Sequence, residues 1–172
     1  MECEDVTGMA LLNIVLDDDQ IMRKKSKPVD KITPRILQLL DDMKETLDDA
    51  NGAGLAAVQV GVLRRVALVY DEDKYIELIN PEIIETEGKQ EDIEGCLSCP
   101  GKWGYTNRPM KVKIRAMNRN GEIETHEGKG LTARAFCHEI DHLDGILFYD
   151  NAVRMIDESE LEEILKKDKE AE

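Results

Sequence analysis

The sequence predicts an α+β fold in which a central helix bearing two histidines packs among antiparallel β-strands, with a further helix near each end of the chain. Three observations indicate this class. Residues 132–145 read as a helix that carries His138 and His142 four positions apart. Residues 33–51 carry the start and stop signals of a second helix. Between these two helices, segments of strand-like composition are separated by short turn sequences.

The helix over residues 33–51 is predicted from its capping residues and its apolar spacing. Thr33 has the side chain of an N-cap, and Pro34 suits the first helical position. Asn51-Gly52 is typical of a helix end. Four apolar residues recur at helical spacing between these signals, namely Ile36, Leu40, Met43 and Leu47. We expect this stripe to pack into the core.

Two pairs of strands are predicted between residues 65 and 126. Residues 65–70 and 75–80 are rich in apolar, β-forming residues and are separated by an acidic turn. Residues 110–117 alternate apolar and basic side chains, and Asn120-Gly121 supplies a hairpin turn into residues 122–126. We interpret His126, in the last of these segments, as a surface strand residue rather than a metal ligand.

The composition limits the classes of function. With 23 Lys and Arg against 37 Asp and Glu, the net charge is −14, which argues against binding nucleic acid through the overall field of the chain. A short basic stretch at residues 23–28 is interpreted as a solvated loop. No apolar run approaches the roughly 20 residues that span a membrane, and the acidic first residues do not resemble a signal or transit peptide. We therefore expect a cytoplasmic protein.

The pattern His138-Glu139-x-x-His142 indicates a metal site. Residues four apart lie on one face of a helix, so both imidazoles can bind one ion, and Glu139 can handle the proton of a water bound to it. A catalytic site needs a third protein ligand and an open position. Phe148 stands where metzincin proteases have a third histidine, which disfavours a zinc peptidase. The better candidate is Cys96, which lies in a loop of glycine and small polar residues.

A closed structural zinc site is the main rival interpretation. Cys96 and Cys99 form a C-x-x-C pair that could join the two histidines as a Cys2His2 site. Such a site gives no role to Glu139, and Pro100 restricts the loop directly after Cys99.

Gln59 is the single polar side chain in a run of small residues at 52–61. Its amide either satisfies buried backbone groups or points into a site as a donor, and the sequence leaves both open.

Three motifs in order resemble the peptide deformylase family. They are the G-x-G-L-A-A-x-Q run from Gly52 to Gln59, E-G-C-L-S from Glu94 to Ser98, and H-E-x-D-H-L-x-G from His138 to Gly145. The resemblance covers roughly residues 9–150. Val58 replaces a frequent proline and Cys137 a common glutamine, but neither change removes a catalytic group.

This resemblance implies an enzyme that hydrolyses the N-formyl group from the starting methionine of newly made polypeptides and releases formate. The motif positions imply that Cys96, His138 and His142 bind the metal and that Glu139 moves protons. The Gln59 amide and the Leu97 N–H would then stabilise the oxyanion. Gly54 is expected to bind the substrate backbone, and its methionine side chain is expected near Ala53, Leu97, Leu131 and Ala135. Glu94 and Arg108 are expected to pair and brace the cysteine loop.

The resemblance also implies a cofactor, partners and boundaries. The expected metal is Fe2+, with Zn2+ or Ni2+ able to use the same ligands. The expected partners are N-formyl-methionyl peptides and, transiently, nascent chains at the ribosome, without direct contact to nucleic acid or membrane. Residues 9–156 would form the catalytic domain, and residues 157–172 an acidic helix or tail that begins at a Ser159-x-x-Glu162 capping box. Residues 1–8 look like an extension, either vector-derived or from a misread start.

Overall fold

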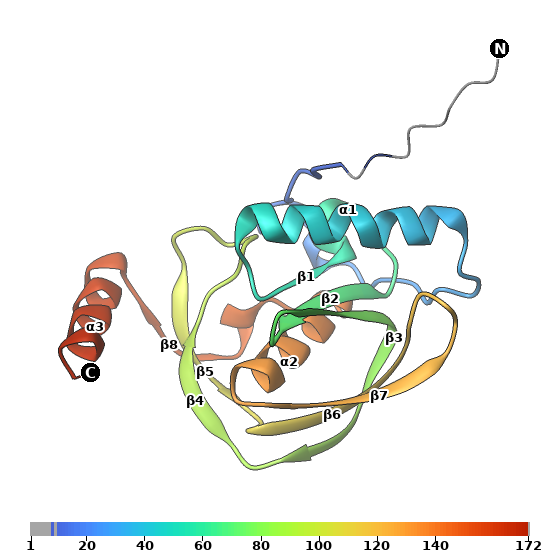
Figure 1. The fold of residues 1–172 in the computed structure, drawn as a ribbon. Helices are drawn as coiled ribbons and strands as arrows, with labels where there is room; N and C mark the ends of the chain where they lie inside the picture. Colours follow the sequence, from blue (N-terminus) through green and yellow to red (C-terminus); the bar gives the residue numbers. More distant parts are fainter. Residues whose placement is uncertain (1–7, 9, 172) are drawn as a thin grey trace.

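The five-stranded antiparallel sheet curves around the central helix α2 (Leu131–Leu143), so that strands lie both above and below it (Figure 1). The computed structural model describes residue 8 and residues 10–171. The order of this sheet is β1-β2-β3-β6-β7. Its strands are β1 (Gly54–Ala56), β2 (Val66–Asp71), β3 (Lys74–Glu87), β6 (Lys111–Met117) and β7 (Ile123–Lys129).

A second antiparallel sheet of three strands, in the order β4-β5-β8, lies beside the first. It consists of β4 (Gln90–Glu94), β5 (Trp103–Arg108) and β8 (Ala152–Ile156). Short 3-10 helices complete the body at η1 (Gln20–Arg23), η2 (Ala57–Val60) and η3 (Phe148–Asp150). The loop after β4 carries Cys96, so this small sheet positions the cysteine against α2.

Irregular pairing lets β3 bend far enough to wrap α2. Its register with β6 shifts between Ile79 and Glu82 and again between Ile83 and Glu85. Such bulges bend a strand and increase its twist. Asn80, at the first shift, has a left-handed φ of 52°, and its side-chain amide bonds both the N–H and the C=O of Val29. The bend is thereby tied to the loop that precedes α1.

Two layers of core lie on either side of β2, because alternate side chains of a strand point to opposite faces. Val66 and Leu68 pack outward against helix α1 (Pro34–Ala50). Ala67 and Val69 pack inward, in the cluster that contains Phe136 of α2. The side chains of residues 66–69 are fully buried on both faces of the strand, which explains why this part of β2 is a continuous apolar run in the sequence.

The predicted α1 is confirmed together with its caps and buried stripe. The Thr33 hydroxyl accepts a bond from the Ile36 N–H, and Asn51 adopts the left-handed conformation that ends the helix. The stripe of Ile36, Leu40, Met43 and Leu47 is buried. The strands predicted at 65–70, 75–80, 110–117 and 122–126 are also confirmed, within a few residues at their ends except that β3 continues to Glu87. His126 lies on β7 and contacts Glu124.

Two predictions about the local structure need correction. The capping box at Ser159 and Glu162 is wrong, because helix α3 (Glu158–Glu170) begins earlier and its N-cap is Asp157, whose carboxylate accepts from the Glu160 N–H. The strands β1, β4, β5 and β8 were absent from the prediction. Glu91, Asp92, Gly104 and Asn107 all have weak strand propensity, so the local strand signal of β4 and β5 is interrupted and their pairing depends on tertiary contacts as well.

Apart from Gly8, the predicted N-terminal extension at residues 1–8 lies outside the described residues. Among the described residues, every helix is too short or too polar to cross a membrane.

Candidate metal centre

Helix α2 presents the predicted ligands on one face. His138 and His142 follow Leu131 and Ala135 at successive helical spacings, so these four side chains form one stripe. The helix ends at Leu143, and Gly145 follows with a φ of +75° at a position where a Cβ would collide with the Arg23 carbonyl oxygen. Phe148 is buried and stacks on the His138 ring at 6.3 Å between centroids. It supports the imidazole instead of binding a metal.

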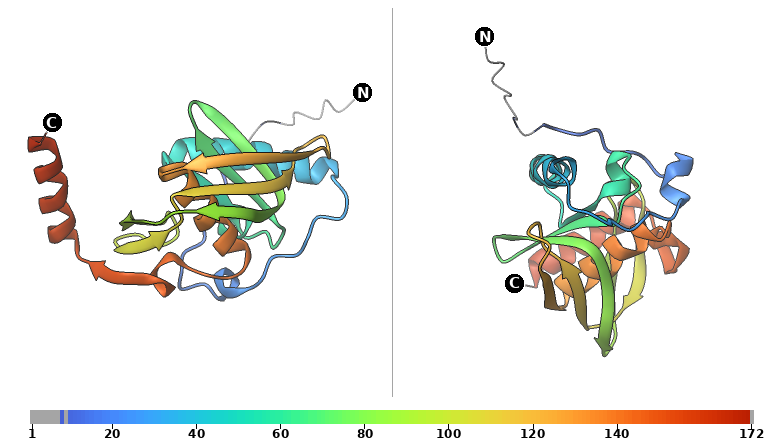
Figure 2. Two further views of the ribbon diagram at one scale, coloured as in Figure 1. Left: turned by 90° about the horizontal axis from the view of Figure 1, so that it is seen from below. Right: turned by 90° about the vertical axis from the view of Figure 1, so that its right-hand side faces the viewer.

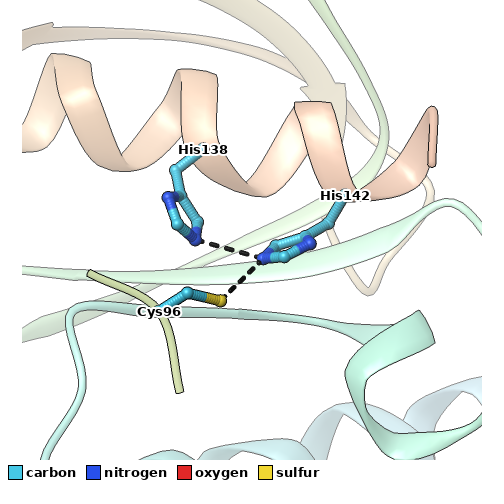
Figure 3. A group of neighbouring side chains, drawn as sticks. All are labelled: Cys96, His138 and His142. Atoms are coloured by element: carbon cyan, nitrogen blue, oxygen red, sulfur yellow. Dashed lines mark hydrogen bonds between the residues drawn. The ribbon is translucent and has the colours of Figure 1, made fainter. Parts of the chain in front are cut away.

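The loop after β4 brings Cys96 to the two histidines. Gly95 permits this path, because a Cβ there would lie 2.3 Å from the Trp103 ring. The Cys96 sulfur lies 3.3 Å from Nε2 of His142, which lies 3.1 Å from Nε2 of His138 (Figure 3). All three ligand atoms lie within 4.8 Å of one another. The structure therefore brings together the three side chains predicted to bind the metal.

The distances and donor types fit a single divalent ion. With ordinary metal–nitrogen and metal–sulfur bond lengths, two tetrahedral ligands lie about 3.3 Å apart for two nitrogens and about 3.6 Å apart for sulfur and nitrogen. The separations of 3.1 Å between the two imidazole nitrogens and 3.3 Å between the Cys96 sulfur and Nε2 of His142 are slightly shorter than these values. Thiolate and imidazole are ligands that Fe2+, Zn2+ and Ni2+ accept. A hydrogen bond with the Cys99 thiol and burial raise the pKa of the Cys96 thiol, so binding an ion there releases its proton.

The buried network behind His138 orients it. Its Nδ1 lies 2.9 Å from Oε2 of Glu94, which leaves Nε2 free for a metal. Arg108 donates to both oxygens of Glu94 and, at 2.6 Å, to Asp141, while Arg134 donates to Glu94 at 2.9 Å. Burial alone would raise the pKa of Glu94, but hydrogen bonds from His138 and Arg108 hold it well below its usual range. The expected Glu94–Arg108 pair is thus confirmed.

Sequence reasoning missed Arg134 and Asp141 as members of this network. A signal was present, because the two residues lie four before and three after His138, on neighbouring positions of the same helix. Arg134 is also a charged residue within an apolar helical stretch, and it is buried. A buried charge needs a partner of opposite sign.

Glu139 is buried next to His138, one of the predicted ligands, and its Oε2 has no hydrogen-bond partner among the described residues. Burial raises the pKa of Glu139 to about 7. The backbone of β1 passes directly over this carboxylate, because a Cβ on Gly54 would lie 2.6 Å from Oε1. Glycine at position 54 therefore keeps space for the Glu139 side chain.

Gln59 fulfils both of the roles left open by the sequence. Its Oε1 accepts from the Ala56 N–H at 2.9 Å, which fixes the amide. Its Nε2 donates to Ser98 at 3.1 Å and lies 3.7 Å from the Cys96 sulfur. Within the described part of the chain, the N–H of Leu97, the residue after Cys96, donates to no protein group, and the Cys99 N–H closes a turn onto the Cys96 carbonyl. The oriented Gln59 amide therefore lies next to the Cys96 sulfur.

The residues predicted to bind substrate occupy different environments. Ala53 is exposed next to Gly54, and Leu131, the first residue of α2, is 70% exposed. Ala135 is almost completely buried one helical turn further on. Leu97 is partly buried against the α1 cluster. Leu131 and Ala135 lie on the face of α2 that carries the two histidines, and Leu97 directly follows Cys96 in the loop.

A closed four-ligand site is disfavoured by the position of Cys99. In the described residues, the group that can share an ion comprises Cys96, His138 and His142, although the Cys99 thiol contacts Cys96. We expect Cys99→Ala to keep one metal ion per chain and to keep catalytic turnover, with a stability loss of about 1 kcal/mol from the small buried cavity. Metal analysis after dialysis and urea unfolding measure both. A metal-free or unfolded Cys99→Ala protein would instead support the Cys2His2 site.

Comparison with known proteins places the chain in one family. The family model for polypeptide deformylase matches residues 11–158. A peptide deformylase of Acetivibrio thermocellus is 60% identical over 154 residues, covering 90% of this chain and 91% of that protein. The crystal structure of a peptide deformylase from Legionella pneumophila has a TM-score of 0.80 at 39% identity and covers 83% of this chain and 86% of that one. The Met-Ala-Ser-bound class I type b enzyme of Acinetobacter baumannii has a TM-score of 0.80 at 31% identity, covering 84% of this chain and 99% of that one.

The matched region contains the whole three-ligand centre, Glu139 and the network behind His138. The chain therefore belongs to the polypeptide deformylase family, the metal-dependent hydrolases that remove the N-formyl group from the N-terminal formyl-methionine of newly synthesised polypeptides and release formate.

Proposed function

We propose that Cys96, His138 and His142 hold the catalytic ion of this deformylase and that this ion is Fe2+, with Zn2+ or Ni2+ able to occupy the same ligands. The observation that carries this assignment is the convergence of the sulfur and both Nε2 atoms within 4.8 Å. Three protein ligands leave an open position, which distinguishes a catalytic from a structural site. An ion bound there would polarise the formyl oxygen and lower the pKa of the attacking water.

Glu139 is proposed as the group that moves the proton. It takes a proton from the attacking water, whose oxygen bonds to the formyl carbon, and gives a proton to the amine nitrogen as the carbon–nitrogen bond breaks. The second proton of the water also passes to the amine, so formate and a protonated α-amine result, and atoms and charge balance. The buried position of Glu139 and its unpartnered Oε2 support this role, since no protein donor holds that oxygen among the described residues.

Gln59 and Leu97 are proposed to stabilise the oxygen that becomes negative in the transition state. The fixed amide of Gln59 lies 3.7 Å from the Cys96 sulfur, and Leu97, whose N–H donates to no protein group among the described residues, directly follows Cys96 in the loop. Donors that are already oriented cost no reorganisation when the charge develops. Their fixed positions come from η2 and from the turn at Cys96–Cys99.

The substrate is proposed to bind along Gly54 as an added strand. β1 is an edge strand of the five-stranded sheet, and an extended peptide can pair with such an edge. The side chain of the formyl-methionine would then contact Ala53, Leu97, Leu131 and Ala135. The Acinetobacter baumannii relative binds Met-Ala-Ser, a peptide that begins with methionine, which supports this class of substrate.

We propose that the enzyme meets its substrates in the cytoplasm as nascent chains leave the ribosome, through transient contacts. The acidic first turns of α3 do not support docking on ribosomal RNA through that helix, because five of residues 157–163 are Asp or Glu. The net charge of −14 likewise supports an enzyme that binds peptides without contacting nucleic acid directly.

The test is formate release from formyl-Met-Ala-Ser by protein purified without oxygen and loaded with Fe2+, Zn2+ or Ni2+ in parallel. We expect release with each metal that binds and the fastest turnover with Fe2+. Protein that binds one ion per chain and releases no formate would refute the assigned roles. Faster turnover with Zn2+ or Ni2+ would refute only the choice of iron.

A further inference from the structure

A second thiol lies directly beside Cys96. Cys96 and Cys99 are the first and last residues of a tight turn, in which the Cys99 N–H donates to the Cys96 carbonyl at 3.0 Å. The end residues of such a turn have Cα atoms less than about 7 Å apart, and a disulfide joins Cα atoms about 4.4–6.8 Å apart. The two side chains also face each other, because the two thiols share a hydrogen bond. The turn therefore holds both sulfurs in contact at a spacing that suits a disulfide.

The thiol of Cys99 is used neither by the metal centre nor by the packing around it. Within the described residues, Cys99 lies outside the three-ligand group that can share an ion. Its side chain is buried in the core cluster that contains Phe136 and Phe148, where a small apolar side chain would pack as well. Helix α3, which projects away from the body in Figure 2, contributes no residue to this cluster. The body of the molecule alone therefore fixes the position of Cys99.

The two thiols differ in exposure. Cys96 is half-buried and faces the open centre beside His142 (Figure 3), whereas Cys99 is fully buried behind it. The proposed reaction requires water to reach this centre, so hydrogen peroxide, a molecule of similar size, can reach the Cys96 sulfur as well. An accessible thiol with a second thiol next to it is the usual arrangement of a redox-sensitive cysteine.

We propose that Cys96 and Cys99 are a reversible oxidation site, in which hydrogen peroxide converts the two thiols to a disulfide and the metal ion is released. The Cys96 sulfur attacks one oxygen of the peroxide, the O–O bond breaks, and a sulfenic acid and one water form. The Cys99 sulfur then attacks the Cys96 sulfur, and the sulfenic oxygen leaves as a second water. The two thiols give up two electrons and two protons and the peroxide takes them up, so atoms and electrons balance.

Release of the ion follows from the chemistry of the oxidised sulfur. A disulfide sulfur carries no negative charge, so the centre keeps only the two imidazoles as ligands. Loss of a group behind a ligand already lowers metal affinity 10- to 100-fold, so loss of the thiolate itself should lower it by more than about 100-fold. This consequence rests on the proposed role of Cys96 as a metal ligand. Formation of the disulfide does not depend on that role.

The disulfide also protects Cys96 from permanent damage. A sulfenic acid without a neighbouring thiol is oxidised further to sulfinic and sulfonic acids, which a dithiol does not reduce. Cys99 captures the sulfenic acid before this happens. In a reducing compartment a disulfide of this kind is transient, so the thiolate and the metal site return when the peroxide is removed.

The test uses protein loaded with Zn2+, because this ion has no redox chemistry of its own. The wild type, Cys99→Ala and Cys137→Ala are treated with hydrogen peroxide, and formate release before treatment checks that each is folded. Cys137 is the matched control, since it is a buried thiol on α2 outside the turn. Peptide mapping by mass spectrometry identifies the oxidised form of Cys96. A chromogenic chelator measures the released ion.

For the wild type and Cys137→Ala, we expect a Cys96–Cys99 disulfide, release of about one ion per chain, and full recovery of formate release after dithiothreitol and fresh Zn2+. For Cys99→Ala, we expect sulfinic and sulfonic acid at Cys96 and no recovery.

Two outcomes would overturn the oxidation site and leave the proposed function intact. One is a treated wild type that binds zinc and releases formate but contains no Cys96–Cys99 disulfide. The other is a Cys99→Ala variant that recovers as fully as the wild type. A disulfide that forms while the ion stays bound would instead refute Cys96 as a metal ligand, and the proposed release of the ion with it.

Discussion

Replacing Glu139 with glutamine is expected to slow formate release by about 10²- to 10⁴-fold, the usual contribution of a general acid and base. Glutamine has nearly the same shape but cannot take a proton from water. The proposed ligands Cys96, His138 and His142 are unchanged, so the variant should still bind one ion per chain. Formate release from formyl-Met-Ala-Ser and metal content are measured on the same preparation.

Stability separates a catalytic from a structural role for Glu139. Its carboxyl group is buried, and its Oε2 has no partner among the described residues, so the charge stabilises no contact at that atom. We therefore expect Glu139→Gln to unfold at the same or a higher urea concentration than the wild type. Glu127→Gln, on an exposed position of β7, is the matched control and should change neither property. A Glu139→Gln protein that keeps its activity, or loses it only by unfolding, would remove Glu139 from the mechanism.

The sequence predicted the elements that carry strong local signals. Helix α1 was predicted from local signals, namely Thr33, Asn51 and the spaced apolar residues. Each cap interacts with backbone groups within about one helical turn of its own position, so its effect on the helix can be predicted without knowing the fold. The three motifs likewise identified Cys96, His138 and His142, which lie together in the structure. For these three positions, residue type and spacing are sufficient for the prediction, because metal binding requires side chains of these types.

The small sheet could not be predicted from local patterns. β4 and β5 pair Glu94 with Gly104 and Glu91 with Asn107, and these residues give no strand signal in isolation. Their pairing nevertheless places Cys96 against α2. The start of α3 was misassigned for a related reason, because Asp157 and Ser159 are both good N-caps and only the end of β8 at Ile156 decides between them.

The network around Glu94 is larger than the single residue pair that was predicted from the sequence. The sequence indicated Glu94 and Arg108 as partners, but the structure adds His138, Arg134 and Asp141 to the same cluster. These residues come from β4, β5 and α2, so their meeting depends on the packing of the small sheet against the helix. A cluster drawn from three elements is visible only after the fold is known.

This cluster predicts a second large effect, from Glu94→Gln. The exchange removes the negative charge that two buried guanidinium groups share and weakens the acceptor for His138 Nδ1. Breaking a buried charge network by removing one partner costs about 3–5 kcal/mol. Loss of a carboxylate behind a ligating histidine lowers metal affinity about 10- to 100-fold. Urea unfolding of the metal-free protein and competition with a chelator measure the two effects separately.

Glu91 provides the matched control, because it lies on the same strand β4 but is exposed and outside the cluster. Glu91→Gln should leave stability and metal affinity at wild-type values. The double variant Glu94→Gln/Arg108→Met tests the cause further, since it removes one of the charges that Glu94→Gln leaves unpaired, and it should recover part of the lost stability without recovering metal affinity. Equal stability of Glu94→Gln and the wild type would mean that the two arginines are satisfied without Glu94. Full metal affinity in that variant would show that the position of His138 is fixed by its packing against Phe148 instead of by the carboxylate.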